Sequence, residues 1–274
     1  MDSNPPEAQE RPLSFLTAAF WTLLVVLSVG MMLSIIDAVH PGAFLDIVTL
    51  ATCKLLAYSI VFFAILRVHE PESAIRRVLA FRRPPAIMVL LGAAVGAGLS
   101  PASMWLDGLF SKRFPPSQLE IDAYERVFSV PTPGKKIALF FALVVVMPIC
   151  DELFFRGALF TPLKKGRRAE SVILATATYD TLLANAQPRE IASILATMLA
   201  LAWIRAVSGS VIPSVVARVV FFGVQVVPLL YGHEPKYSGA IALGGAAIAA
   251  VSLAGIAAVG KRSARVLEAR LEDG

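Results

Sequence analysis

Two adjacent carboxylates followed by an arginine form the most chemically suggestive segment of the sequence, CDELFFRG at residues 150–157. Asp151 and Glu152 come at the end of a long apolar run, and Arg156 follows Glu152 by four positions. Residues four apart share one face of a helix, so Glu152 and Arg156 can form an ion pair. A carboxylate that is removed from water and partly neutralised can act as a general base toward water. The alternative is a structural ion pair that anchors the helix end at the cytoplasmic interface.

Other polar residues inside the apolar runs also need a reason, because polar groups are costly in a bilayer. These residues are Lys54, Asp180, Arg205, Arg218 and Gln225. Lys54 is either a buried partner for a carboxylate on another helix or a side chain long enough to reach an interface. We expect Arg205 to be an anchor at a helix end.

The segment DELFFRG resembles the EExxxR motif, usually written EELxFRG, of the type II CAAX-protease and bacteriocin-immunity membrane proteins, also called CPBP intramembrane proteases. That family's pattern continues with a histidine on the next span and ends with GS-x-x-P-x-x-x-x-H-x-x-x-N on a later one. Gly209, Ser210 and Pro213 match the last motif at the right spacing. The resemblance covers roughly residues 137–231. It implies an intramembrane endopeptidase whose motif positions are Asp151, Glu152, Arg156, Asp180 and Arg218.

Four of the motif positions depart from the family pattern. Asp151 replaces the first glutamate, which keeps the charge but shortens the arm. The second-motif histidine aligns with Asp180, and Tyr179 is the competing register. The third-motif histidine aligns with Arg218 and the asparagine with Phe222. In the family, these histidines and the asparagine hold the metal or water and stabilise the reacting carbonyl.

The resemblance therefore implies a divalent metal such as zinc, but the expected ligands are lost. Arginine has no lone pair to offer a metal and stays charged. The remaining acidic residues form a hard-oxygen set that is unlike a zinc site. The chain's histidines, at positions 40, 69 and 233, fall in loops or at span ends. We therefore expect no cofactor and no bound metal. Instead, an ion pair between Asp180 and Arg218 is expected to fill the space of a catalytic water.

Composition indicates that these residues lie in an integral membrane protein. Of the 274 residues, 57% are hydrophobic and 16% charged, whereas soluble domains are about half apolar and a quarter charged. The apolar residues form long runs separated by short charged loops. The net charge of +5 does not indicate nucleic acid, because basic loops between spans orient membrane proteins and attract anionic lipid. The expected partners are the lipid bilayer and a membrane protein or peptide, with no nucleic acid.

The pattern of runs predicts an all-α, polytopic transmembrane bundle of about eight spans, with the family core in spans four to seven. The expected spans are residues 15–36, 44–66, 86–106, 137–155, 169–186, 191–208, 211–231 and 239–260. The fourth and fifth are short or polar, which is typical of sheltered helices that line a site. The predicted parts are N-terminal helices with an interfacial loop (1–136), the family-like core (137–231), and a last helix with a basic tail (232–274).

Loop charges and small residues add three expectations. Lys and Arg are concentrated in the loops on the same side as both termini, which places both termini in the cytoplasm of a multi-pass protein, in the inner membrane if the cell is bacterial. The segments SQLEIDAYERVF and SAIRRVLAFRR have helical amphipathic patterns typical of the membrane surface. Gly92 and Gly96 form a GxxxG pattern that favours close helix packing.

Three functions are compatible with the sequence. The first is a non-catalytic family member, a pseudoprotease that binds or shelters a membrane partner. The second is an active, divergent intramembrane endopeptidase that uses Glu152 as general base. The third is an unrelated transporter or structural membrane component. Arg218 separates the first two, because a working site of the family's kind needs a neutral acceptor or donor at that position.

Overall fold

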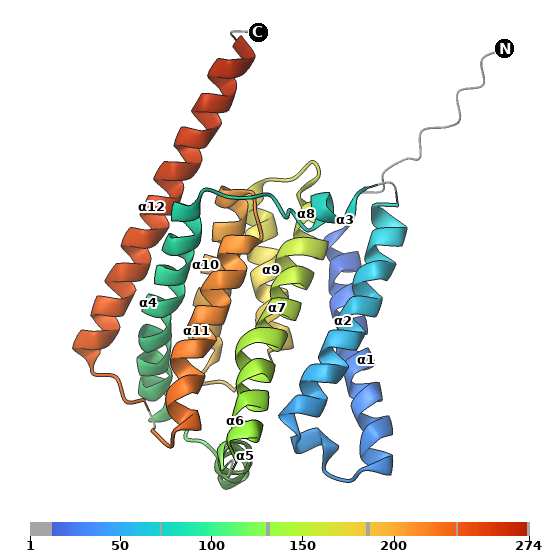
Figure 1. Ribbon diagram of the computed structural model, residues 1–274, viewed down its shortest axis with the longest axis vertical. Helices are drawn as coiled ribbons and strands as arrows, with labels where there is room; N and C mark the ends of the chain where they lie inside the picture. Colours follow the sequence, from blue (N-terminus) through green and yellow to red (C-terminus); the bar gives the residue numbers. More distant parts are fainter. Residues whose placement is uncertain (1–12, 72, 130–131, 185–186, 234, 273–274) are drawn as a thin grey trace, which may run out of the picture.

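The chain forms a bundle of roughly parallel helices (Figure 1). The computed structural model describes residues 13–71, 73–129, 132–184, 187–233 and 235–272, with the side chains of 263–272 excepted. Every regular element in this part of the chain is a helix. The all-α prediction is therefore confirmed.

Seven of the described helices are long and apolar enough to cross a bilayer. They are α1 (Phe15–Val39), α2 (Ile47–His69), α4 (Ala86–Ser111), the continuous helix Pro133–Lys164, α10 (Ile191–Ser208), α11 (Ile212–Leu230) and α12 (Gly239–Glu272). An eighth helix, α9 (Ala169–Leu183), runs beside them with 15 residues. That length corresponds to about 22 Å, less than the roughly 30 Å hydrocarbon core. The structure is thus consistent with the expected bundle of about eight spans.

The fourth span is longer than the sequence predicted. It was expected over residues 137–155, but the helix runs continuously over Pro133–Lys164. It comprises α6 (Pro133–Phe140), a π-helical stretch η2 (Phe141–Val146), α7 (Met147–Glu152), a second π-helical stretch η3 (Leu153–Leu159) and α8 (Phe160–Lys164). The charged motif was expected at the end of the span. In the structure these charged residues lie within the helix and are buried by neighbouring helices.

Small residues bring α4 into close contact with α11 and α12. A Cβ atom at Gly92 would lie 2.5 Å from the carbonyl oxygen of Pro213, and one at Gly96 would collide with the Ala217 backbone. Gly98 approaches Gly245 of α12 in the same way. The GxxxG pattern therefore packs α4 inside the bundle, as the sequence predicted.

A second packing unit joins α1 and α2 to the motif helix. Trp21 and Val25 of α1, Val61 and Ile65 of α2, and Phe154 of η3 belong to one buried apolar cluster. In contrast, large apolar side chains on the outer faces of the helices are exposed, as expected for surfaces that contact lipid rather than water. They include Leu16, Leu23 and Leu27 of α1, Ile60 of α2, Leu90 of α4, and Leu243 and Val251 of α12.

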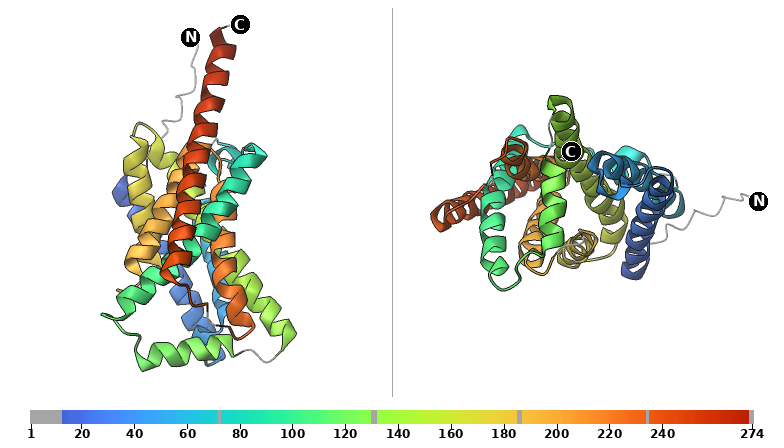
Figure 2. Two further views of the ribbon diagram at one scale, coloured as in Figure 1. Left: turned by 90° about the vertical axis from the view of Figure 1, so that its left-hand side faces the viewer. Right: turned by 90° about the horizontal axis from the view of Figure 1, so that it is seen from below.

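Both predicted surface segments lie at the ends of the bundle. Helix α5 (Gln118–Phe128) lies across one end, hereafter the α5 end (Figure 2). The Ser117 backbone N–H and Arg189 both donate to Glu120, and these hydrogen bonds lower the pKa of the Glu120 carboxyl, the Ser117 bond contributing most. Helix α3 (Ile75–Val78) lies at the other end, where α1 begins and α12 ends, hereafter the terminal end.

We predict that Gly96→Ala destabilises the bundle by about 1–3 kcal/mol, because the added methyl group overpacks the contact with α11. The matched control is Gly108→Ala on the same helix, where an added Cβ meets nothing within 4 Å. That change should be neutral or stabilising by up to about 1 kcal/mol from helix propensity. Thermal unfolding in detergent compares the two; equal melting temperatures would mean that the α4–α11 contact is looser than described.

The loop charges also predict a sidedness that labelling can measure. Single cysteines introduced before residue 12 and at Lys261 should react with an impermeant maleimide from the cytoplasmic side in inverted vesicles. A cysteine at Lys112, at the α5 end, should react from the opposite side. Cys53 and Cys150 are buried, so they give little background. Labelling of either terminal position from outside intact cells would contradict the eight-span topology.

Candidate functional site

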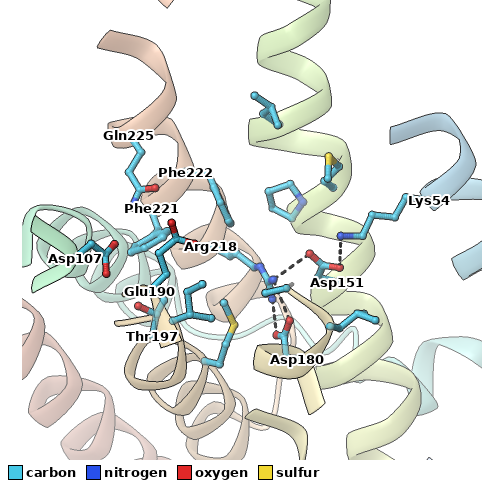
Figure 3. Close-up of a pocket in the computed structure, with 17 residues that line it drawn as sticks. Lys54, Asp107, Asp151, Asp180, Glu190, Thr197, Arg218, Phe221, Phe222 and Gln225 are labelled. Atoms are coloured by element: carbon cyan, nitrogen blue, oxygen red, sulfur yellow. Dashed lines mark hydrogen bonds and ion pairs between the residues drawn. The ribbon is translucent and has the colours of Figure 1, made fainter. Parts of the chain in front are cut away.

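Arg218 of α11 binds three carboxylates at once, in the interior of the bundle. Figure 3 shows two of them, Asp151 and Asp180. Its Nη1 lies 3.0 Å from Glu152 Oε1 and 2.7 Å from Asp180 Oδ2. Its Nη2 lies 3.0 Å from Asp151 Oδ2 and 3.1 Å from Asp180 Oδ1. The ion pair between Asp180 and Arg218 that the sequence predicted is therefore present. The guanidinium also reaches the two motif carboxylates of α7.

Helix α2 supplies two further partners for Asp151. Lys54 Nζ lies 2.7 Å from Asp151 Oδ1, and the Tyr58 hydroxyl donates to the same oxygen at 2.9 Å. Lys54 is thus the partner for a carboxylate on another helix, which was one of its two interpretations. Tyr58 was not among the residues predicted from the sequence. Its spacing of four from Lys54, which places both on one helix face, was the available signal.

Arg156 has a different main partner from the one its spacing predicted. It lies 3.5 Å from Glu152, four positions before it. Its closest ion pair is with Asp180 of α9, and its Nη2 donates to the Met198 carbonyl of α10 at 2.8 Å. Spacing along one helix could find the Glu152 contact but not the partners on other helices. The structure thus makes Arg156 a link between the motif helix, α9 and α10.

The cluster contains three cations and three anions, and its formal charge is zero. The cations are Lys54, Arg156 and Arg218, and the anions are Asp151, Glu152 and Asp180. Glu152 and Arg156 are 0% exposed and Arg218 is 3% exposed. Ions this deeply buried are tolerated when each is paired and hydrogen-bonded. Glu152 and Arg156 lie within the continuous helix Pro133–Lys164, so the alternative of an ion pair that anchors a helix end at the interface is wrong for them.

The two π-helical stretches flank the acidic pair of α7. A π-helical turn is wider than an α-helical turn and interrupts the regular spacing, which is why such turns are frequent at functional sites. Here the turns precede and follow Met147–Glu152. From this segment Asp151 reaches α2 and α11, Glu152 reaches α11, and Arg156 in the second π-helical stretch reaches α9 and α10.

A cavity of about 360 Å³ adjoins the ion cluster. Asp151, Asp180 and Arg218 line its inner end, and Asp107 and Glu190 line it near the α5 end of the bundle. Its walls are mainly apolar and are formed by Leu143, Met147, Pro148, Leu183, Ile194, Met198, Phe221 and Phe222. Phe222, at the position of the family's asparagine, thus presents an apolar ring to the cavity (Figure 3). Glu152 is not among the residues that line this cavity.

Tyr179 and Arg205, two further residues considered from the sequence, lie in different surroundings. The Tyr179 hydroxyl donates to the Phe15 carbonyl of α1 at 2.9 Å, away from the cluster. Geometry therefore favours the Asp180 register. Arg205 is only 6% exposed, and its Nε donates to the Arg156 carbonyl at 2.9 Å. It lies in the last turn of α10, as expected for a helix-end residue, but its side chain is buried against the motif helix.

The residues present do not fit a catalytic metal ion. In the described part of the chain, no group of three or more His, Cys, Asp or Glu side chains is arranged to hold a metal. Asp151, Glu152 and Asp180 each turn at least one oxygen toward Arg218. A zinc site needs neutral imidazole or anionic ligands that are free to coordinate. Here a guanidinium occupies the point where the three carboxylates converge.

The fold and this cluster define a polytopic helical membrane protein with an intramembrane ion cluster on its central helices. Residues 133–223, about a third of the chain, match the family model described as "Rce1-like: Type II CAAX prenyl endopeptidase Rce1-like". The match is consistent with a member of the CPBP family, and it confirms the resemblance read from the motifs. No curated protein and no solved structure matches the chain.

Replacing Arg218 should destabilise the protein through charge imbalance. Arg218→His leaves two cations facing three buried anions if the new imidazole is neutral, and breaking a buried pair costs about 3–5 kcal/mol. The double change Asp180→His with Arg218→His leaves two of each charge and should regain part of that stability. Unfolding in detergent at pH 8 measures both. The control is Arg126→His on α5, which is exposed and should change stability by less than about 0.5 kcal/mol.

The test is the order of the variants in stability. If the double variant is less stable than Arg218→His alone, then charge balance does not govern the cluster, and the individual hydrogen bonds of Asp180 matter more.

Proposed function

We propose that this chain is a catalytically impaired relative of the type II CAAX endopeptidases, a pseudoprotease whose membrane bundle binds a protein or peptide partner. One observation carries the proposal. Arg218 stands at a motif position of the family, and its guanidinium binds Asp151, Glu152 and Asp180 together. The acidic residues that the resemblance assigns to catalysis are therefore engaged in a neutral structural cluster.

Electrostatics opposes a metal ion in this cluster. A cation bound by the three carboxylates would lie beside the Arg218 guanidinium. Two like charges about 4 Å apart repel by roughly 4 kcal/mol for unit charges at an effective dielectric near 20, and a divalent ion doubles this. Arginine does not lose its proton in proteins, so the repulsion cannot be relieved by titration. The arrangement supports a permanent guanidinium in place of a metal.

The alternative of an active enzyme that uses Glu152 as general base has weaker support. Glu152 is fully buried and does not line the cavity. Its Oε1 is held by Arg218 at 3.0 Å, and its Oε2 has no hydrogen-bond partner among the described residues. A general base must reach the proton it removes, directly or through one water.

The cavity supports the partner-binding part of the proposal. Its apolar walls and the acidic residues Asp107 and Glu190 near the α5 end suit a segment with apolar and basic side chains. A single membrane-embedded segment of a partner protein has this chemistry. The family match makes an unrelated transporter or structural component the less supported alternative.

A combined metal and cleavage assay tests the proposal. The purified chain is incubated with zinc, freed of unbound metal and analysed for zinc content and for cleavage of a quenched prenylated CAAX reporter. We expect less than about 0.1 zinc per chain, as no complete ligand set is present. Cleavage should equal that of Glu152→Gln, which serves as the matched control. Stoichiometric zinc together with turnover that disappears in Glu152→Gln would show that the chain is an enzyme.

A further inference from the structure

A strap of residues 75–83 crosses the terminal end of the bundle and is fixed to the family-like core. The Thr161 hydroxyl donates to the Val78 carbonyl at 2.7 Å, and the Val211 backbone N–H donates to the Ala80 carbonyl at 3.3 Å. Ala80 has a φ of 49°, in the left-handed region that non-glycine residues rarely adopt. Several contacts thus hold the strap in a conformation that the chain alone would disfavour.

Two motif residues that have no catalytic group, Gly157 and Ser210, contact the strap directly. Leu79 packs directly against Gly157, where an added Cβ would lie 2.6 Å from the Leu79 Cδ2 atom. The Ser210 hydroxyl donates to the Arg82 carbonyl at 2.8 Å. Gly157 ends the DELFFRG segment, and Ser210 belongs to the GS pair. The core of the bundle therefore sets the position of the strap.

The outward face of the strap combines positive charge with exposed apolar groups. Four arginines are exposed on it, and none forms an ion pair with a described residue: Arg76, Arg77, Arg82 and Arg83. Next to them in the sequence, Ile75 is 45% exposed and Phe81 is 43% exposed. Apolar side chains beside arginines are typical of segments that lie at the headgroup level of a bilayer.

A buried cation, Arg205 of α10, lies beneath the strap. Only 6% of Arg205 is exposed. Its Nη2 donates a hydrogen bond to the hydroxyl of Thr161, which in turn donates to the Val78 carbonyl of the strap. Its bonds go to a backbone carbonyl and a hydroxyl, and no carboxylate among the described residues pairs with it. Its guanidinium lies over the ring of Phe160, 5.1 Å from the ring centroid, and this contact supplies no anion either. Such a cation favours a nearby anion from outside the chain.

We propose that the strap and Arg205 form a binding site for the phosphate headgroup of an anionic phospholipid. The exposed arginines attract the negatively charged leaflet, and Arg guanidinium groups bind phosphate oxygens in pairs. Ile75 and Phe81 enter the interface beside the headgroup. The site lies at the end of the bundle that the loop charges place in the cytoplasm. It does not depend on whether the ion cluster is catalytic.

A lipid titration with a charge-matched control tests the site. Labelled phosphatidylglycerol is titrated into the full chain in neutral detergent, and binding is followed by fluorescence anisotropy, with labelled phosphatidylcholine as the neutral lipid. Replacing the four strap arginines by glutamine should weaken phosphatidylglycerol binding at least about tenfold. The control replaces four exposed basic residues near the α5 end by glutamine: Lys112, Arg113, Arg126 and Lys135. It should weaken binding less than about twofold if the strap is the site.

One further variant and a competition with phosphate complete the test. Arg205→Gln keeps an amide donor while removing the charge, and it should also weaken binding several-fold. Equal losses in the two quadruple variants would overturn the proposal, because they would mean that net charge alone attracts the lipid. Displacement of the lipid by millimolar inorganic phosphate would overturn it as well, since the site would then recognise a free anion. Unchanged melting temperatures of the quadruple variants show that any loss is not caused by unfolding.

Discussion

One guanidinium that binds three carboxylates is the interaction on which the rest of this structure depends. Arg218 of α11 reaches Asp151 and Glu152 of α7 and Asp180 of α9. None of these charges could remain in the bundle interior by itself, because an unpaired ion in a low-dielectric environment is strongly disfavoured. The cluster therefore determines which faces of these three helices must meet.

Lys54 and Arg156 complete the charge balance and extend the cluster to α2 and α10. Lys54 neutralises Asp151 from α2, and Arg156 binds Asp180 and the Met198 carbonyl of α10. A buried ion cluster contributes little net stability compared with apolar packing, but it penalises other helix registers. Apolar helices in lipid lack a strong hydrophobic preference for one arrangement. Here the ions, together with the glycine contacts of α4, give the bundle a defined arrangement.

The family motifs serve two physical purposes in this chain. The charged positions form the cluster, whereas Gly157 and Ser210 dock the strap at the terminal end. These purposes are separable, because a glycine that permits close approach and a serine that caps a carbonyl need no catalytic group nearby. The charged cluster and the docking of the strap can therefore vary independently of each other.

The sequence by itself determined the class of the protein and the identity of the charged positions. Long apolar runs can satisfy their backbone groups in lipid only as helices, so the all-α membrane bundle followed from composition and periodicity. Motif spacing also singled out Asp151, Glu152, Arg156, Asp180 and Arg218. Tertiary structure alone decided the pairing. Tyr58 entered the cluster from α2, Arg156 bound Asp180 in preference to Glu152, and Arg205 became buried. Spacing along one helix reports which residues share a face, but it does not report which faces of distant helices meet.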